Sequence, residues 1–206
     1  MSDFVLESGH VRLEPLSREH VGGLVSASAG GEELYRWSAV PLGWDATKKY
    51  VETALEWKAA GRAVPFAVVR VADGAVIGST RFFDIERWDW PEGHERRGRS
   101  SPDVCEIGYT WYAPAAIRTA VNTEAKTLLL THTFEEWKVL RVCLHTDVRN
   151  ERSRAAMERI GCRFEGILRA HRMAVDATPR DSARYSIVAA EWPAMKEKLA
   201  ELAKRT

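Results

Sequence analysis

The pair Asp73-Gly74, set between two apolar stretches, constrains the fold more than any other feature of this sequence. Residues 66–71 and 76–85 are rich in β-branched and aromatic side chains, and an Asp-Gly pair between such stretches is typical of a hairpin turn. Residues 104–112 form a further apolar stretch, and residues 123–137 follow with apolar side chains at helical spacing. Hairpin strands combined with strands that helices separate predict an α/β fold with a mixed central sheet.

The remaining pattern alternates strands and helices along the chain. Apolar periodicity, capping residues and terminal glycines set the boundaries of these elements. Strands are expected at 11–16, 139–148, 164–175 and 183–188, and helices from Ser17 to Gly30, at 46–60, from Asn150 to Gly161, and at 191–204. Since no repeat or low-complexity segment interrupts this order, we expect a single domain over residues 1–206.

Composition narrows the class of protein. The chain has 30 basic and 29 acidic side chains and a net charge of +1, which argues against a polycation that coats nucleic acid. Its three cysteines form no Cys-x-x-Cys pair and have no histidine at metal spacing, which indicates buried thiols in a reducing compartment. No signal peptide is visible after Met1 and no window of 18 apolar residues exists. We therefore expect a cytoplasmic protein without a metal or a membrane segment.

Residues 86–103 interrupt the pattern with a long polar loop. This loop contains two tryptophans and a basic cluster, namely Trp88, Trp90, Arg96, Arg97 and Arg99. Loops of this length are either solvated insertions or functional segments, and the sequence leaves both interpretations open.

A strand that runs through a short turn into a long helix gives the clearest candidate site. The strand at 104–112 ends before Pro114, and the helix opens a few residues later. The first turn of a helix has unpaired N–H groups and the positive end of the helix dipole, which suit a pyrophosphate. Ten arginines and six acidic residues lie between Arg141 and Arg184. This positive excess suits an anionic ligand, and a solvated helix face explains it as well.

Three short motifs accompany this segment in a fixed order. They are Gly78-Ser-Thr-Arg-Phe after the hairpin turn, Asn150-Glu-Arg-Ser leading into Phe164-Glu-Gly, and the closing strand with Asp181-Ser182 and Tyr185-Ser186. Together with the stretch from Glu106 to Lys126, these motifs resemble the GNAT superfamily of N-acyltransferases, most of all the branch of the ribosomal-protein N-terminal acetyltransferases. The resemblance runs from Val11 to Ile187 and is densest from Glu106 to Arg169.

The resemblance implies a fold and a reaction. The fold is a mixed, mostly antiparallel central sheet of about seven strands, flanked by helices, in which a central strand splays from its neighbour and the donor lies in the gap. The reaction is the direct transfer of an acyl group, acetyl from acetyl-CoA, to a primary amine in a ternary complex. Alignment of the amine and the thioester would supply much of the rate.

The phosphate-binding loop departs from the pattern of the family. That pattern is Gln or Arg, two residues, Gly, one residue, and Gly or Ala, whereas this chain has Ile117-Arg-Thr-Ala-Val-Asn122. Ala120 fits if its φ is negative and blocks close approach if φ must be positive. Asn122 tolerates a left-handed conformation, and Arg118 beside it would neutralise a phosphate. The departure leaves the identity of the acyl donor open.

Three residues have the catalytic roles that the resemblance implies. Glu106 would accept the proton of the amine, directly or through water, because an alkylammonium must lose a proton before it attacks a thioester. The alternative is a strand-edge carboxylate paired with an arginine. Asn150 would contact the pantetheine arm of the donor and cap its own helix. Ser153 would protonate the leaving thiolate.

The resemblance also implies the contacts of the two substrates. The splayed strand would hold the donor and stabilise the oxyanion, the loop would hold the pyrophosphate, and the next helix would add contacts. The implied donor residues are Ile107, Gly108, Tyr109, Arg118, Thr119, Ala120, Val121, Asn122, Thr123, Asn150 and Arg154. The implied acceptor residues are Trp37, Arg81, Phe83, Asp84, Trp88 and His171. Whether His171 acts as a base or lines the pocket stays open.

Two alternatives to this function remain. The altered loop and the arginines of residues 86–103 would suit an aminoacyl-tRNA as the donor, which requires phosphate contacts over a broad basic surface. The missing glycine motivates the second alternative, a degenerate domain that binds a ligand or partner without catalysis. The sequence identifies neither the acceptor, a small-molecule or peptide amine, nor the oligomeric state, and the resemblance implies that a homodimer is common in this branch.

Overall fold

The computed structural model describes residues 3–204 and is built on an eight-stranded sheet in the order β1-β2-β3-β4-β5-β6-β8-β7. Neighbouring strands are antiparallel except β5 and β6, which are parallel. The strands are β1 (Leu6–Glu7), β2 (Val11–Pro15), β3 (Ala63–Arg70), β4 (Val76–Glu86), β5 (Val104–Tyr112), β6 (Arg141–Asp147), β7 (Arg163–Met173) and β8 (Pro179–Val188). The predicted mixed, mostly antiparallel sheet is confirmed, and the two-residue β1 is an addition to it.

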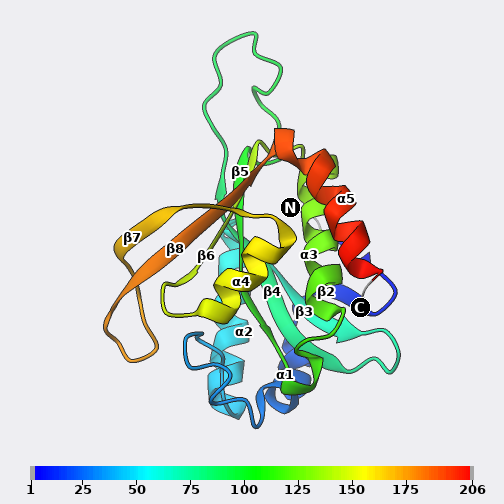
Figure 1. The fold of residues 1–206 in the computed structure, drawn as a ribbon, viewed down its shortest axis with the longest axis vertical. Coiled ribbons are helices and arrows are strands. Elements are labelled where there is room, and N and C mark those ends of the chain that lie inside the picture. The colour runs from blue at the N-terminus through cyan, green and yellow to red at the C-terminus, as the bar shows by residue number, and fades with distance from the viewer. Residues whose placement is uncertain (1–2, 205–206) are drawn as a thin grey trace.

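Helices cover the sheet on both sides (Figure 1). They are α1 (Val21–Ser28), α2 (Trp44–Ala59), α3 (Val121–Thr131), α4 (Glu151–Ile160) and α5 (Trp192–Ala203). The helices α3, α4 and α5 lie in front of the sheet in this view, whereas α1 and α2 pack behind β3 and β4. Each face therefore has its own hydrophobic core.

Strand β3 shows how the sequence produces these two cores. Phe66 and Val68 face the core under α3, and Ala67 and Val69 face the core under α1 and α2. Because both faces are buried, the strand is apolar along its length instead of alternating with polar residues.

Several element boundaries differ from those expected. The helix expected from Ser17 begins as a 3-10 turn, and α1 starts only at Val21. Helix α2 begins at Trp44, directly after Gly43, whose φ of 76° is outside helical geometry. Helix α3 begins at Val121 and continues into a π-helical segment, His132–Glu136.

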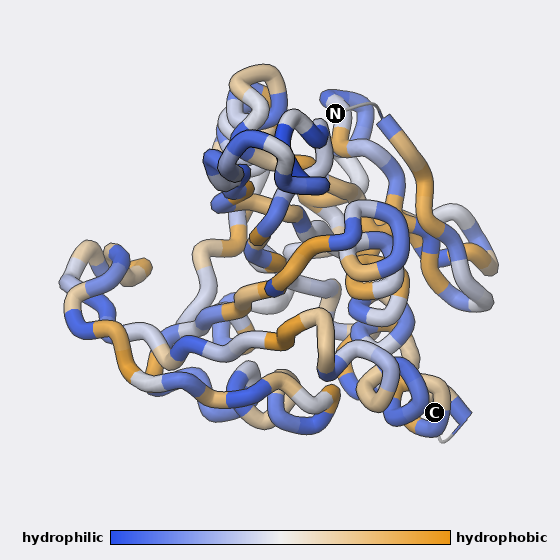
Figure 2. The backbone as a smooth tube through the Cα atoms, turned by 90° about the horizontal axis from the view of Figure 1, so that it is seen from above, coloured by the Kyte–Doolittle hydropathy of each residue, from blue (hydrophilic) through white to orange (hydrophobic). Residues whose placement is uncertain are grey.

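Two segments extend from the body of the molecule. The loop at 87–103 rises at the top of Figure 1, and the β7–β8 hairpin reaches to the left; from above, the tip of this hairpin stands apart from the rest of the chain (Figure 2). In the loop, Arg96 donates to the Lys138 carbonyl at 3.0 Å and is ion-paired with Asp103. This member of the basic cluster is thus bound within the protein.

Two further expectations concern cysteines and membranes. The three cysteines are free and buried. Burial raises the pKa of Cys162 to about 12. Within residues 3–204, no helix has both the length and the apolar character needed to cross a bilayer.

Candidate active site

The parallel strands β5 and β6 pair over only three residues and then separate. Val104, Cys105 and Glu106 pair with Arg141, Val142 and Cys143, and no further pair in the described chain joins the two strands. A strand presents N–H and C=O groups to both sides. From Ile107 to Tyr112, one edge of β5 therefore faces a gap in the sheet, and Glu106 lies where the gap begins.

A β-bulge changes the direction of β5 just beyond this point. Ser79 pairs with Trp111 and Arg81 pairs with Gly108, so two residues of β5 oppose the single residue Thr80. Tyr109, in the bulge, has a φ of 51°. Bulges of this kind turn a strand and redirect its side chains. The bulge thus shapes the predicted donor segment Ile107–Tyr109.

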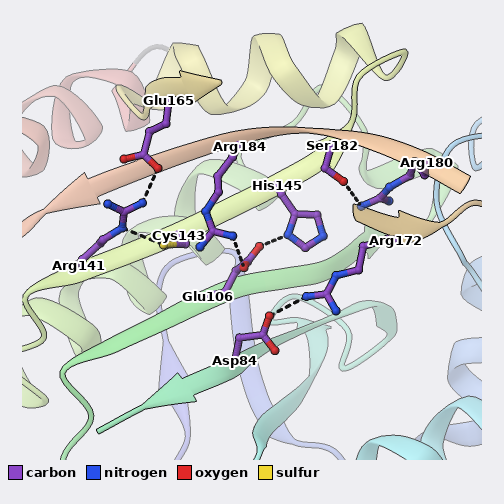
Figure 3. Close-up of polar contacts among 10 residues, drawn as sticks. All are labelled: Asp84, Glu106, Arg141, Cys143, His145, Glu165, Arg172, Arg180, Ser182 and Arg184. Carbon is purple, nitrogen blue, oxygen red and sulfur yellow. Dashed lines mark hydrogen bonds and ion pairs between the residues drawn. The ribbon is translucent and has the colours of Figure 1, made fainter. Parts of the chain in front are cut away.

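Glu106 is 2% exposed and is the centre of a polar cluster (Figure 3). One carboxylate oxygen contacts Nδ1 of His145, and the other lies 3.7 Å from Nη1 of Arg184. The three side chains come from the adjacent strands β5, β6 and β8, where Glu106 pairs with Cys143 and His145 pairs with Arg184. The carboxylate paired with an arginine, one of the two alternatives for Glu106, is present as the contact with Arg184. The contact with the His145 imidazole leaves the alternative of a proton acceptor open.

His145 is the site residue that sequence reasoning missed. Its ring centre lies 5.0 Å from that of His171 and 6.1 Å from that of Phe83. Burial and the proximity of His145 lower the pKa of His171, whose Nδ1 is buried without a hydrogen-bond partner. The structure therefore brings the predicted residues His171 and Phe83 to the Glu106 cluster, with His145 between them.

Asp84 lies on the rim of the same face. Its carboxylate accepts a hydrogen bond from Nη2 of Arg172 at 2.7 Å, which joins β4 to the β7–β8 hairpin (Figure 3). Both side chains of this pair are well exposed, so it contributes little to stability. The Asp84–Arg172 pair nevertheless shows that the β7–β8 hairpin reaches β4 on the face of the sheet where Glu106 lies.

Arg81 is enclosed by aromatic rings. Its guanidinium carbon lies 4.2 Å from the ring centre of Tyr109, 4.8 Å from that of Tyr50 and 5.5 Å from that of Trp57. The residue is 1% exposed, and its Nε and Nη2 have no hydrogen-bond partner. Arg81 pairs with Gly108, two residues from Glu106, and so lies on the same face of the sheet.

The opening of α3 has unpaired main-chain N–H groups. Those of Thr119, Ala120, Asn122 and Thr123 have no acceptor in the described chain, and that of Val121 donates to the Thr119 hydroxyl at 3.4 Å. Ala120 has a φ of −59°, a conformation that alanine adopts without strain. The left-handed residue of this loop is Arg118, with a φ of 63°.

Arg152 at the start of α4 is a basic neighbour of Arg118. Burial and the positive charge of Arg118 lower the pKa of Arg152, whose Nη2 donates to the Leu34 carbonyl at 2.8 Å. The predicted donor residue Arg154 points elsewhere, with Nε 3.3 Å from the Tyr185 hydroxyl and Nη1 3.4 Å from the Val148 carbonyl. The guanidiniums of Arg118 and Arg152 thus act on each other, and a third, that of Arg159, contacts α3 directly, with Nη2 3.0 Å from the Thr123 hydroxyl oxygen.

Asn150 caps α4, since its side-chain oxygen accepts the N–H of Ser153 at 3.1 Å. Ser153 itself is half-buried in the first turn of this helix. The cap fixes the position of both residues on the β6 side of the gap in the sheet.

The two tryptophans of the predicted acceptor set lie apart from the Glu106 cluster. Trp37 is stacked against the guanidinium of Arg149, 4.1 Å from the ring centre. Trp88 packs against Trp90 in the 87–103 loop, with its main-chain N–H on Asp103. In the described chain, neither indole has a ring contact or hydrogen bond with Glu106, His145 or His171.

A metal centre has no support in the described residues, where no group of three or more His, Cys, Asp or Glu side chains lies close enough to hold an ion. At Glu106 a carboxylate and an imidazole are in contact beside an open strand edge, a combination that can accept a proton.

Comparison with known proteins agrees with this architecture. Residues 10–163 match the model of the acetyltransferase (GNAT) domain. The chain belongs to the GNAT family. This confirms the resemblance predicted from the sequence motifs.

One curated relative of this GNAT chain is YdaF of Bacillus subtilis (strain 168), whose name describes a ribosomal N-acetyltransferase. The two are 39% identical over 87 residues, which are 42% of this chain and 46% of YdaF, so the match spans about half of the relative. A GCN5-related N-acetyltransferase from Brucella melitensis superposes with a TM-score of 0.84 at 27% identity, over 98% of this chain and 86% of that one.

Two more solved structures share the fold of this GNAT chain. A protein from T. thermophilus described as an acetyltransferase has a TM-score of 0.78 at 30% identity, with 98% of each chain covered. Mycobacterium smegmatis RimJ, solved in complex with CoA-disulfide, has a TM-score of 0.75 at 21% identity over 97% of this chain and 93% of that one, which shows the fold alone.

Proposed function

We propose that this GNAT protein transfers an acetyl group directly from acetyl-CoA to a primary amine within a ternary complex. The observation that carries the proposal is the gap between β5 and β6, with the Glu106–His145 contact at its closed end. A narrow donor arm fits along the open edge of β5, and the amine approaches from the face on which Glu106 lies.

The donor is held mainly by its phosphates. The unpaired N–H groups of Thr119, Ala120, Asn122 and Thr123 and the positive end of α3 bind the pyrophosphate. Arg118 and Arg152 neutralise its charge, and Asn150 contacts the pantetheine arm. The alanine at position 120 does not obstruct this binding, because its φ is negative.

Glu106 and His145 act together as the base. The contact of Nδ1 with the Glu106 carboxylate keeps the proton on Nδ1, so the lone pair of Nε2 is free to accept the proton of the ammonium. The amine nitrogen then attacks the thioester carbonyl, the C–N bond forms, and the N–H groups of the splayed strand stabilise the oxyanion. The C–S bond breaks, and the leaving thiolate takes a proton from the Ser153 hydroxyl. The proton that the new amide nitrogen loses returns to Ser153, directly or through water, and His145 releases its proton to solvent.

Calorimetric titration with acetyl-CoA and CoA tests the donor site. We expect micromolar binding and a loss of about tenfold or more in Arg118→Ala and Arg152→Ala, since hydrogen bonds from a guanidinium to phosphate are charge-assisted. Arg163→Ala, which removes an exposed arginine paired with Glu191, is the matched control and is expected to bind normally. If no CoA binds and RNA is retained in a salt-sensitive way, the donor is an aminoacyl-tRNA instead.

Thiol release with a panel of amines tests the reaction. We expect Glu106→Gln and His145→Gln to lower kcat by about a hundredfold or more while CoA affinity is kept, because a general base contributes a factor of about 10² to 10⁴. Binding of CoA without thiol release for any amine, and no effect of Glu106→Gln, would identify a non-catalytic binding domain.

A further inference from the structure

The buried arginine next to the proposed acceptor site lacks a counter-ion. Arg81 is 1% exposed, and two of its three nitrogens have no hydrogen-bond partner. Three aromatic rings surround the guanidinium, which stabilises a cation but supplies no acceptor for its N–H groups. An unpaired charge at this depth is costly unless something binds to it.

A second arginine, Arg180, also has a buried nitrogen without a hydrogen-bond partner. Arg180 donates to the Ser182 hydroxyl at 3.0 Å, and its Nε is buried without a partner. Arg180 lies opposite Arg172 in the β7–β8 pairing, an arrangement of like charges that is unfavourable without an anion. Arg180 lies four residues from Arg184 along β8, so its side chain is on the same face of the sheet as Arg184 and Glu106.

The carboxylates nearby are already engaged. Asp84 pairs with Arg172, Glu106 contacts His145 and lies near Arg184, and Asp147 pairs with Arg149 at 2.7 Å. In the described chain, none of these carboxylates hydrogen-bonds to Arg81 or Arg180. The missing anion must therefore come from outside the chain.

We propose that Arg81 and Arg180 bind a carboxylate group of the acceptor, so that the amine substrate is a molecule that also carries a carboxylate. This inference rests on the proposed function, since it assigns the acceptor of the same site. The ring of Tyr109, 39% exposed at the bulge, covers Arg81, and binding of the carboxylate requires this ring to turn aside. Arginine suits this role because its planar fork binds a carboxylate through two N–H groups.

The spacing of the site favours a particular length of acceptor. Arg81 pairs with Gly108, two residues from Glu106, which is about 7 Å along the strand. An amine at the Glu106–His145 pair and a carboxylate at Arg81 are then several bonds apart. A free ω-amino acid and a short peptide with a nearby carboxylate share this chemistry.

Binding is tested first, without turnover, by NMR of the arginine Nε–Hε groups. The probes are 4-aminobutyrate and Gly-Gly, each compared with its carboxamide, and the resonance that disappears in Arg81→Lys identifies Arg81. We expect a saturable shift of the Arg81 resonance with 4-aminobutyrate and with Gly-Gly, at millimolar affinity, and no shift with their carboxamides. No shift up to about 50 mM, far above the affinity that two charge-assisted hydrogen bonds provide, overturns the inference.

Steady-state kinetics then gives the second readout. For carboxylate-bearing amines we expect Arg81→Gln to raise KM at least tenfold with little change in kcat, and Arg81→Lys to recover part of the loss. Arg62→Gln is the matched control, since Arg62 also lies over the Trp57 ring but is exposed. The 4-aminobutyrate and Gly-Gly arms separate a free amino acid from a peptide as the acceptor.

The outcomes distinguish the two proposals. A saturable shift without thiol release for any amine leaves the carboxylate site standing and removes the transferase function. Equal acetylation of amines with and without a carboxylate, unaffected by Arg81→Gln, leaves the transferase standing and overturns the carboxylate site.

Discussion

Single residues determine whether β4 and β5 can approach as closely as they do. A Cβ atom at Gly78 would lie 2.1 Å from the Trp111 carbonyl oxygen, so the backbone of β5 would have to move. We expect Gly78→Ala to lower the free energy of unfolding by about 3 kcal/mol. At Gly9 an added Cβ atom meets nothing within 4 Å, so Gly9→Ala should change the free energy of unfolding by less than about 0.5 kcal/mol. Urea unfolding of both variants measures the difference, and equal effects would contradict the packing argument.

Lys126 is a buried cation that the proposed mechanism does not use. Burial lowers its pKa from 10.5 to about 8, and its amine donates to the Thr110 hydroxyl at 3.0 Å. Between pH 8 and 10.5 the unfolded chain binds more protons here than the folded one, so this residue makes stability rise with pH across that window. We expect Lys126→Met to stabilise the protein by about 2 kcal/mol at pH 7.

The measurement for Lys126→Met is urea unfolding of wild type and variant at about pH 7 and about pH 9.5. The extra free energy of unfolding of the variant should shrink as pH rises. Above the lowered pKa the Lys126 amine is neutral in folded wild type, and the free energy needed to deprotonate it in the unfolded chain falls as pH approaches 10.5. An advantage that stays constant with pH would mean that packing, and not charge burial, separates the two proteins.

The sequence predicted some site residues and missed others for physical reasons. Glu106 and Asn150 could be proposed from the sequence because each stands in a segment that resembles a family motif. His145 belongs to no such motif. The sequence indicated only that it follows the apolar Leu144 in a strand, which places the two side chains on opposite faces of β6. The sequence suggested Arg154 as a donor residue, whereas the contacts of the folded chain make Arg152 a second candidate, because residues two apart on a helix point in nearly opposite directions.

At the scale of elements, the start of α4 combines two functions in Asn150. Asn150→Ala removes the acceptor for the Ser153 N–H and should cost about 1 kcal/mol of stability. Asn150→Asp keeps the cap and therefore the stability, but it lacks the amide N–H groups and brings a negative charge toward the proposed phosphate site. We expect only the aspartate variant to combine normal stability with weakened CoA binding, as measured by thermal unfolding and calorimetry. Normal CoA affinity in this variant would leave Asn150 as a cap alone.

The elements themselves were easier to predict than their ends. Strong periodicity identified the hairpin of β3 and β4 and the helix that follows β5. The strand β1 was missed because two residues are too short to show alternation. The 3-10 turn before α1 and the π-helical end of α3 depend on packing against the rest of the fold, which propensities do not encode.

At the scale of the whole molecule, the sheet is two antiparallel parts joined by three residue pairs. One part holds β1 to β5 and the other holds β6, β8 and β7, and in the described chain the two parts share a single main-chain strand pairing, that of β5 with β6. A donor bound in the gap would contact both parts. We expect acetyl-CoA to slow amide hydrogen exchange in β6 as well as in β5, measured by mass spectrometry. Protection confined to the opening of α3 would show that the donor does not enter the gap.

The width of the gap between β5 and β6 limits which molecules can bind in it. An outer strand of a sheet is accessible to any extended chain, which is why proteins protect such strands against association. The free side of β5 after Glu106 faces β6 instead, and α4 packs against β6. An unbranched ligand can lie there and hydrogen-bond to the free N–H and C=O groups of β5. A strand that belongs to a sheet of another protein is too broad to enter. We therefore expect this break in pairing to admit a narrow ligand and to disfavour the addition of a strand from another protein.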